Sequence, residues 1–137
     1  MSMIIEELIK AQQFALANKP QIGGFPFLAK VLQQAGITKN TWALPSCQSI
    51  YFIKGKAVVQ QGTPLITGTH EIKNFNQEDL IKIIQLDQNG KSSFAEFLQS
   101  AWEAGVTIYE VDFIKRYVTY YGFNNESYRE SYPEIKI

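Results

Sequence analysis

The residues best suited to covalent chemistry are one cysteine, Cys47, and one histidine, His70, each the only one of its type. A thiolate activated by a neighbouring imidazole is a nucleophile, so this pair could serve a small enzyme. A reactive cysteine needs a nearby cation or helix start that lowers its pKa, and no motif brings the two side chains together. The alternative interpretation is a small side chain buried between apolar strands. One cysteine and one histidine also fall short of the ligands of a zinc site.

A second set of candidate ligands lies in the segment QLDQNGKSSFAEF, which imitates a calcium loop between two helices. Asp87, Asn89 and Glu96 fall on positions 3, 5 and 12 of the twelve-residue scheme, with Gly90 at position 6. Position 1 is Gln85 in place of aspartate, which removes a carboxylate ligand. An Asn-Gly helix stop followed by a capped helix explains the same residues, so no metal or other cofactor is expected.

A third candidate is an acidic and aromatic surface near the C-terminus. The segments VTIYEVDF and YVTYYGF predict a hairpin with a tight turn near Ile114 and Lys115. If Phe113 pairs with Arg116, alternation divides the hairpin into two faces. The apolar face, expected to lie under a helix, carries Tyr109, Val111, Val118 and Tyr120. The polar face, continued beyond the strand, carries Glu110, Asp112, Tyr117, Tyr121, Asn124 and Glu126.

Tyrosines and carboxylates so arranged suit the binding of a protein or small-molecule partner, and exposed aromatic side chains are also compatible with a homodimer. Strands favour Tyr, Thr and Val in any case, and a solvated sheet face needs polar residues, so an ordinary sheet face explains the same pattern. Our functional hypothesis is a non-enzymatic binding or protein-interaction module that uses the C-terminal hairpin face. The rival hypothesis is a small enzyme with Cys47 as nucleophile and His70 as base.

Four helices and two hairpins must position these residues. Hydrophobic periodicity predicts helices over residues 2–17, 26–35 and 77–87, and a fourth that follows a Ser93/Glu96 capping box and ends at Gly105. The segments SIYFI and AVVQQ flank a two-residue turn at Lys54 and Gly55, which predicts an earlier hairpin. Pairing Ile53 with Lys56 would direct one set of apolar side chains toward the core, namely Ile50, Phe52, Ala57 and Val59.

The two helix-hairpin regions share a short repeat. The segments FLAKVLQQAGIT (27–38) and FLQSAWEAGVT (97–107) each lead a helix into Ala-Gly, then Ile or Val, then Thr, before a hairpin. We predict an α+β fold of four helices with antiparallel β-hairpins, in which two helix-hairpin repeats could close around one core. The length of 137 residues fits one domain over 1–137.

Composition excludes several classes of protein. Thirteen basic residues balance thirteen acidic ones, so no overall field favours nucleic acid or anionic lipid. Apolar runs are only a few residues long, far short of the roughly 20 that a membrane helix needs. The N-terminus carries Glu6 and Glu7 where a secretory signal would be basic, and one cysteine cannot form an internal disulfide, so a cytoplasmic setting is expected.

The segment from residue 90 to residue 133, about a third of the chain, carries a family resemblance. Its matching residues are Gly90, Phe94, Phe97, Ala104-Gly105-Val106, Val111-Asp112, Tyr120-Tyr121, Glu130 and Pro133. In these it resembles the YdfO-like or YbcV-like family, small bacterial and prophage proteins of unknown function often labelled phage-envelope-like. The resemblance implies an α+β domain of bacterial origin, carried on a mobile element, and brings no activity. The chain departs from it at Asn124-Asn125, where the family tends to have glycine, which leaves the shape of the last turn open.

Overall fold

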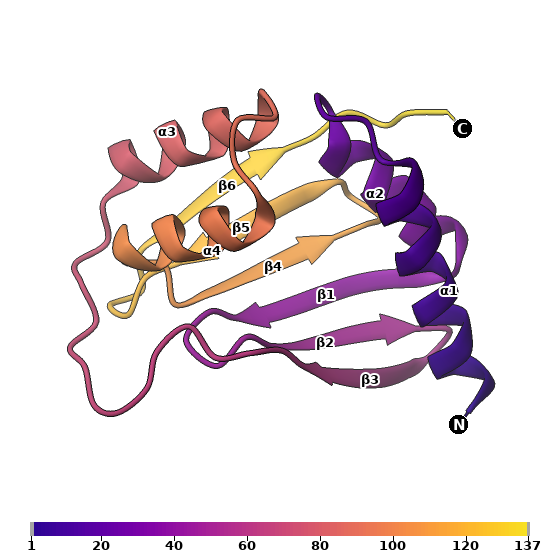
Figure 1. The fold of residues 1–137 in the computed structure, drawn as a ribbon, viewed down its shortest axis with the longest axis horizontal. Coiled ribbons are helices and arrows are strands. Elements are labelled where there is room, and N and C mark those ends of the chain that lie inside the picture. Colours follow the sequence, from indigo (N-terminus) through magenta and orange to yellow (C-terminus); the bar gives the residue numbers. More distant parts are fainter. Residues whose placement is uncertain (1, 137) are drawn as a thin grey trace.

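The computed structural model describes residues 2–136, which form four helices and one six-stranded antiparallel sheet (Figure 1). The helices are α1 (Met3–Asn18), α2 (Gly24–Gln34), α3 (Gln77–Gln88) and α4 (Phe94–Glu103). The strands are β1 (Ile37–Ala43), β2 (Gln48–Ile53), β3 (Lys56–Gln61), β4 (Ile108–Asp112), β5 (Tyr117–Tyr121) and β6 (Ser127–Ser131). The strand order is β3-β2-β1-β4-β5-β6. The α+β class predicted from the sequence is confirmed.

Side-chain caps fix where three of the helices begin. The Ser2 hydroxyl accepts a hydrogen bond from Ile5 N–H (3.2 Å), and the Asn76 side chain accepts one from Asp79 N–H (3.0 Å). At the start of α4, Ser93 and Glu96 form the predicted capping box, in which each side chain accepts from the backbone N–H of the other. These caps are local in sequence, which is why the predicted helix bounds agree with the structure to within two residues.

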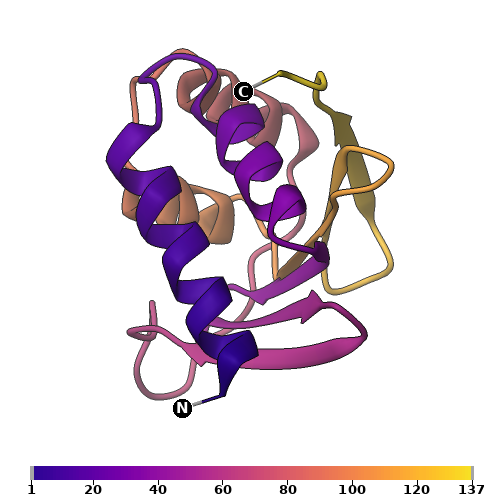
Figure 2. The ribbon, with the colours of Figure 1, turned by 90° about the vertical axis from the view of Figure 1, so that its right-hand side faces the viewer.

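All four helices lie on one face of the sheet, which curves around them (Figures 1 and 2). The burial of alternate strand residues agrees with this arrangement, because Tyr109 and Val111 of β4 and Val118 and Tyr120 of β5 are buried beneath the helices. No described helix covers the opposite face of the sheet, which we call the open face. Its side chains come from every strand, because side chains alternate between the two faces.

The face assignment predicted for the first hairpin is wrong. The register is confirmed, since Ile53 pairs with Lys56. The core side, however, carries Ser49, Tyr51 and Ile53, all buried. Both alternating sets of β2 are largely apolar, so hydrophobicity could not decide between them; Tyr51 turns inward, where its hydroxyl meets Gln12 of α1. The residues predicted for the core lie on the open face instead, namely Ile50, Phe52, Ala57 and Val59.

The two halves of the chain repeat one plan, α-α-β-β-β, at an offset of 69 residues. This offset relates residues 35–38 to 104–107 and carries α1, α2, β1, β2 and β3 onto α3, α4, β4, β5 and β6. The equivalent strands β1 and β4 pair antiparallel at the centre of the sheet, where Thr41 lies opposite its own equivalent, Glu110. A pseudo-twofold axis therefore passes between these two residues. Each predicted hairpin is part of a three-stranded unit, to which β1 or β6 adds a strand.

The repeat extends to individual hydrogen bonds. Leu44 N–H donates to the Thr107 carbonyl (2.9 Å), and its equivalent Phe113 N–H donates to the Thr38 carbonyl (3.0 Å). The Thr38 hydroxyl donates to the Phe52 carbonyl (3.4 Å), and the Thr107 hydroxyl donates to the Tyr121 carbonyl (3.2 Å). The two Ala-Gly-Ile/Val-Thr segments thus form the same connection, from α2 to β1 and from α4 to β4, which we call the joint.

Two equivalent glycines of this joint are expected to differ in their tolerance of a methyl group. Both Gly36 and Gly105 have a positive φ (100° and 89°), which costs an alanine about 1–2 kcal/mol. A Cβ on Gly36 would meet only the flexible side chain of Lys54, whereas one on Gly105 would lie 2.5 Å from the Asn74 carbonyl oxygen. We therefore expect Gly105→Ala to lower the free energy of unfolding by about 1–3 kcal/mol more than Gly36→Ala in urea titrations. Equal losses would contradict the described packing at Gly105.

Candidate functional site

The acidic and aromatic residues predicted on the last hairpin lie on the open face. The predicted register is confirmed, because Glu110 pairs with Thr119 and Asp112 with Tyr117. Glu110, Asp112, Tyr117 and Tyr121 are half-buried, although no helix covers them. Neighbouring side chains on the sheet provide this partial cover.

The two carboxylates of β4 make different interactions. Asp112 Oδ1 accepts hydrogen bonds from the backbone N–H groups of Ile114 (3.0 Å) and Lys115 (2.8 Å), so this carboxylate closes the β4–β5 turn. Glu110 forms an ion pair with Lys39 of β1, with 3.7 Å between Nζ and Oε1. Both members of that pair are more than a third exposed, so the pair contributes little to stability and stays free to exchange partners.

Asn124 and Glu126 belong to the turn between β5 and β6. Glu126 Oε1 accepts from Asn124 N–H (2.8 Å), and the Glu126 carbonyl accepts from Gly122 N–H (2.9 Å). Asn125 adopts φ 63°, a left-handed conformation that asparagine tolerates better than most residues. The shape of the last turn, left open by the sequence, is therefore built by Asn125 in place of glycine and is held by the Glu126 side chain.

The sequence analysis missed an arginine that completes this surface. Arg129 of β6 lies across β5, with its guanidinium carbon 3.9 Å from the Tyr117 ring centroid and its Nε–H donating to Thr119 Oγ1 (3.1 Å). Within residues 2–136, no carboxylate lies within ion-pair distance of it. The alternation Ser-Tyr-Arg-Glu-Ser was the available signal, but its polar composition resembles a loop more than a strand.

The other flank of the open face is apolar. Val59 of β3 is 59% exposed, and Ile50 and Phe52 of β2 are half-buried between Val59 and the centre of the sheet. Ile108, on the central strand β4, is 43% exposed. The Lys39 ammonium lies 5.5 Å from the Phe52 ring centroid and so joins the apolar flank to the ionic centre. The open face therefore has an apolar flank on β2 and β3, charges at its centre, and an aromatic flank with an arginine on β5 and β6.

The thiol of Cys47 is buried, whereas the His70 ring is exposed in the segment between β3 and α3. Cys47 Sγ donates to the Leu44 carbonyl (3.5 Å), and His70 Nε2 lies 2.7 Å from the Thr67 carbonyl oxygen. Burial raises the pKa of the Cys47 thiol, and the Trp42 indole N–H, which has no oxygen or nitrogen acceptor, lowers it by less. No hydrogen bond joins Cys47 to His70 within residues 2–136.

The residues of the calcium-like segment are engaged at helix ends. Glu96 belongs to the capping box of α4, and the Asn89 amide donates to the Gln85 carbonyl (2.9 Å) at the end of α3. Asp87 accepts from the Ser92 hydroxyl (3.5 Å), and burial raises the pKa of its carboxyl. Among residues 2–136, no three His, Cys, Asp or Glu side chains are grouped as metal ligands.

In the described part of the chain, the helices are too short or too polar to cross a membrane.

Comparisons with known proteins place the chain in a family. An uncharacterized protein of Mycobacterium tuberculosis and one of Mycobacterium bovis are each 42% identical to it over 136 residues, which cover 99% of this chain and 83% of theirs. A family described as "Protein of unknown function (DUF1398)" matches residues 13–130. The chain therefore belongs to the DUF1398 family.

Proposed function

We propose that this protein is a non-enzymatic interaction module and that its open face binds the open face of a second copy. The observation that carries the proposal is an uncovered six-stranded sheet face with exposed or half-buried apolar and aromatic side chains. A solvated sheet face is normally polar, and contiguous exposed apolar surface usually marks an interaction site.

The composition of the open face supports this proposal. Tyr, Phe and Arg are enriched at the centres of protein interfaces, where a few such residues dominate the binding energy. Arg129 is fixed by its hydrogen bond to Thr119 and by its stacking on Tyr117, so little side-chain entropy is lost when it binds. The Tyr117–Arg129 stack is accordingly the expected anchor of the aromatic flank.

The arrangement of charge favours a second copy as the occupant. One row of neighbours across the sheet reads Phe52, Lys39, Asp112, Tyr117. A second copy, generated by a rotation of 180° about a line parallel to the strands and above the space between β1 and β4, places this row over the first one in reverse order. Lys39 then faces Asp112 of the second copy, and Phe52 faces its Tyr117. The same rotation brings opposite charges together and ring against ring. The net charge of the open face is zero, so the two copies do not repel each other.

The finer assignments from the sequence belong to the same proposal. The Val111-Asp112 and Tyr120-Tyr121 strands support kinship with YdfO-like or YbcV-like proteins and carriage on a mobile element. The free thiol of Cys47 agrees with a reducing compartment such as the bacterial cytoplasm. A dimer that depends on surface contacts needs neither a cofactor nor a catalytic residue.

A glutamate at position 52 is expected to abolish self-association. In Phe52→Glu, a carboxylate replaces the ring at the apolar flank and would be desolvated against Tyr117 of the second copy. Sedimentation equilibrium at about 100 μM should show a dimer for the native chain and a monomer for this variant, since protein interfaces of the standard size, roughly 1,600 Å², bind in the micromolar range or better. Phe14→Glu is the matched control, because Phe14 is 53% exposed on α1, away from the open face, and should leave the dimer intact. A native chain that stays monomeric would refute the proposal.

The rival hypothesis, an enzyme with Cys47 as nucleophile and His70 as base, is tested by thiol labelling. Burial and a raised pKa both lower the reactivity of Cys47, so labelling at pH 7 should be at least about a hundredfold slower than in denaturant. The rate should rise with pH only in the alkaline range. Rapid labelling below pH 7, reduced by His70→Ala, would instead favour an activated thiolate.

A further inference from the structure

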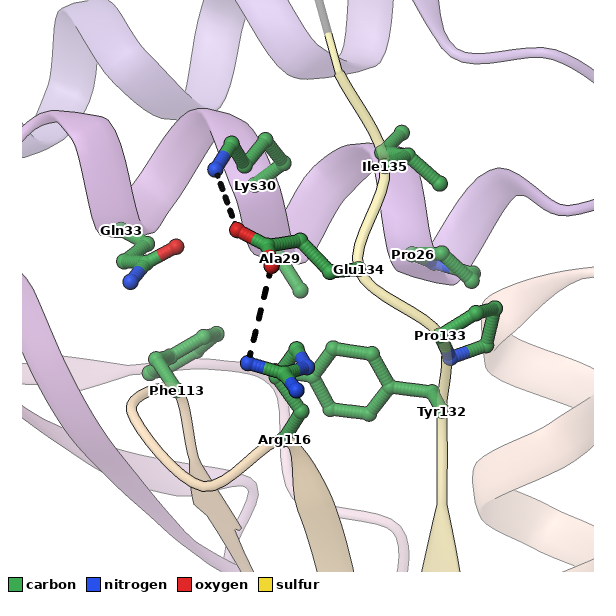
Figure 3. Close-up of a pocket in the computed structure, with 10 residues that line it drawn as sticks. All are labelled: Pro26, Ala29, Lys30, Gln33, Phe113, Arg116, Tyr132, Pro133, Glu134 and Ile135. Atoms are coloured by element: carbon green, nitrogen blue, oxygen red, sulfur yellow. Dashed lines mark hydrogen bonds and ion pairs between the residues drawn. The ribbon is translucent and has the colours of Figure 1, made fainter.

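A narrow cleft lies between α2, the β4–β5 turn and the C-terminal strap, which we define as residues 132–135 (Figure 3). The Glu134 carboxylate extends from the strap between two cations. It lies 3.1 Å from Lys30 Nζ and 3.9 Å from Arg116 Nη1. With Glu134 in place the cleft has a volume of about 10 Å³, which is no more than one water molecule needs.

The fold holds the backbone of both cations, and it largely buries the side chain of one of them. The Lys30 side chain is only 19% exposed, on the helix that also carries the buried Ala29. Arg116 is fixed through its backbone, because its N–H donates to the Asp112 carbonyl (2.8 Å) and its carbonyl accepts from Tyr132 N–H (3.1 Å). The Arg116 side chain is 41% exposed and the Glu134 side chain is 54% exposed. The cleft therefore places a largely buried lysine beside a half-exposed arginine, and an exposed carboxylate occupies the space between them.

Glu134 does not satisfy the cations fully. A well-formed arginine–carboxylate contact is bidentate, with nitrogen–oxygen distances of roughly 2.7–2.9 Å. The Arg116–Glu134 contact, at 3.9 Å, is about an ångström longer than this. An oxyanion without a tether to the strap could approach Lys30 and Arg116 closely at the same time, and the Gln33 amide faces the same space (Figure 3).

The first half of the chain shows that the fold does not need charge here. The strap sequence Tyr-Pro-Glu-Ile resembles Thr-Pro-Leu-Ile at 63–66, the segment that follows β3. Arg116 corresponds to Cys47, which has the same left-handed backbone (φ 60° and 52°), and the carbonyls of both accept a backbone hydrogen bond, from Tyr132 N–H and Gly62 N–H respectively. Leu65 packs against the core cluster that contains Cys47. The first half therefore has a buried thiol and an apolar side chain in this region, so the fold does not require an ion pair there.

We propose that Lys30 and Arg116 form a binding site for an oxyanion, a carboxylate or a phosphate group, and that Glu134 occupies this site as a displaceable internal ligand. Displacement requires only rotation of an exposed side chain. The strap itself stays anchored, because the Tyr132 ring packs edge-on against Phe25 at 5.1 Å between centroids. The incoming anion gains the close contact with Arg116 that the tethered carboxylate lacks.

Binding of inorganic phosphate and of acetate to variants of this cleft tests the proposal. In Glu134→Gln the internal competitor is removed, and phosphate affinity should rise about tenfold if Glu134 occupies the site nine-tenths of the time. The shift in melting temperature with phosphate, measured against sodium chloride of equal ionic strength, reports this affinity. Adding Lys30→Gln and Arg116→Gln to that variant should abolish the response. Whichever of phosphate and acetate gives the larger shift identifies the class of ligand.

Glu7→Gln provides the matched control. It removes a surface carboxylate from a single cation, Lys54, and so leaves no cationic pair. A Glu134→Gln variant that responds to neither anion more strongly than Glu7→Gln would overturn the proposal. A response that persists without Lys30 and Arg116 would do the same. Both results are independent of the dimer, because the cleft lies outside the open face.

Discussion

The structure depends on the antiparallel pairing of β1 with β4. Each half of the chain contains about 70 residues, a size at which a folded chain buries only about 60% of its surface, and each alone would leave a central strand with an unpaired edge. The ladder between the equivalent strands closes both edges and makes one continuous sheet. The helices of both halves can then pack on a single surface, where Ile37 and Val106 are fully buried at equivalent positions.

Equivalent positions in the two halves distinguish residues that the fold requires from residues that are free to differ. The Ala-Gly-Ile/Val-Thr joint recurs in both halves with the same left-handed glycine and the same threonine hydrogen bond. Position 47 has the backbone of position 116 but a buried thiol in place of a guanidinium. Where equivalent positions share a backbone and differ in chemistry, the difference is not imposed by folding. Arg116 lies at such a position in the second half.

The structural features that could be predicted correctly are those determined by residues close together in the sequence. The Ser93/Glu96 capping box, the Lys54-Gly55 turn and the register of the last hairpin follow from residues within a few positions of one another, and all were correct. The buried face of β2 was not predictable, because Tyr51 and Ile53 compete with Ile50 and Phe52 and only the distant α1 decides between them. The strand β6 was missed because a polar edge strand has no hydrophobic alternation. Neither the contact between residues 30 and 134 nor that between 117 and 129 has a local signal.

The uneven chemistry of the open face narrows how two copies could meet on it. The β5–β6 flank carries Tyr117, Tyr121, Arg129 and two serines, whereas the β2–β3 flank carries Ile50, Phe52 and Val59. A half-turn about a line across the strands, through the row of Thr41 and Glu110, would bring Glu110 against Glu110 and Arg129 against Arg129. A half-turn about the strand direction brings the apolar flank of each copy against the aromatic flank of the other. Like-charge contacts between desolvated groups cost several kcal/mol, so charge selects the second arrangement.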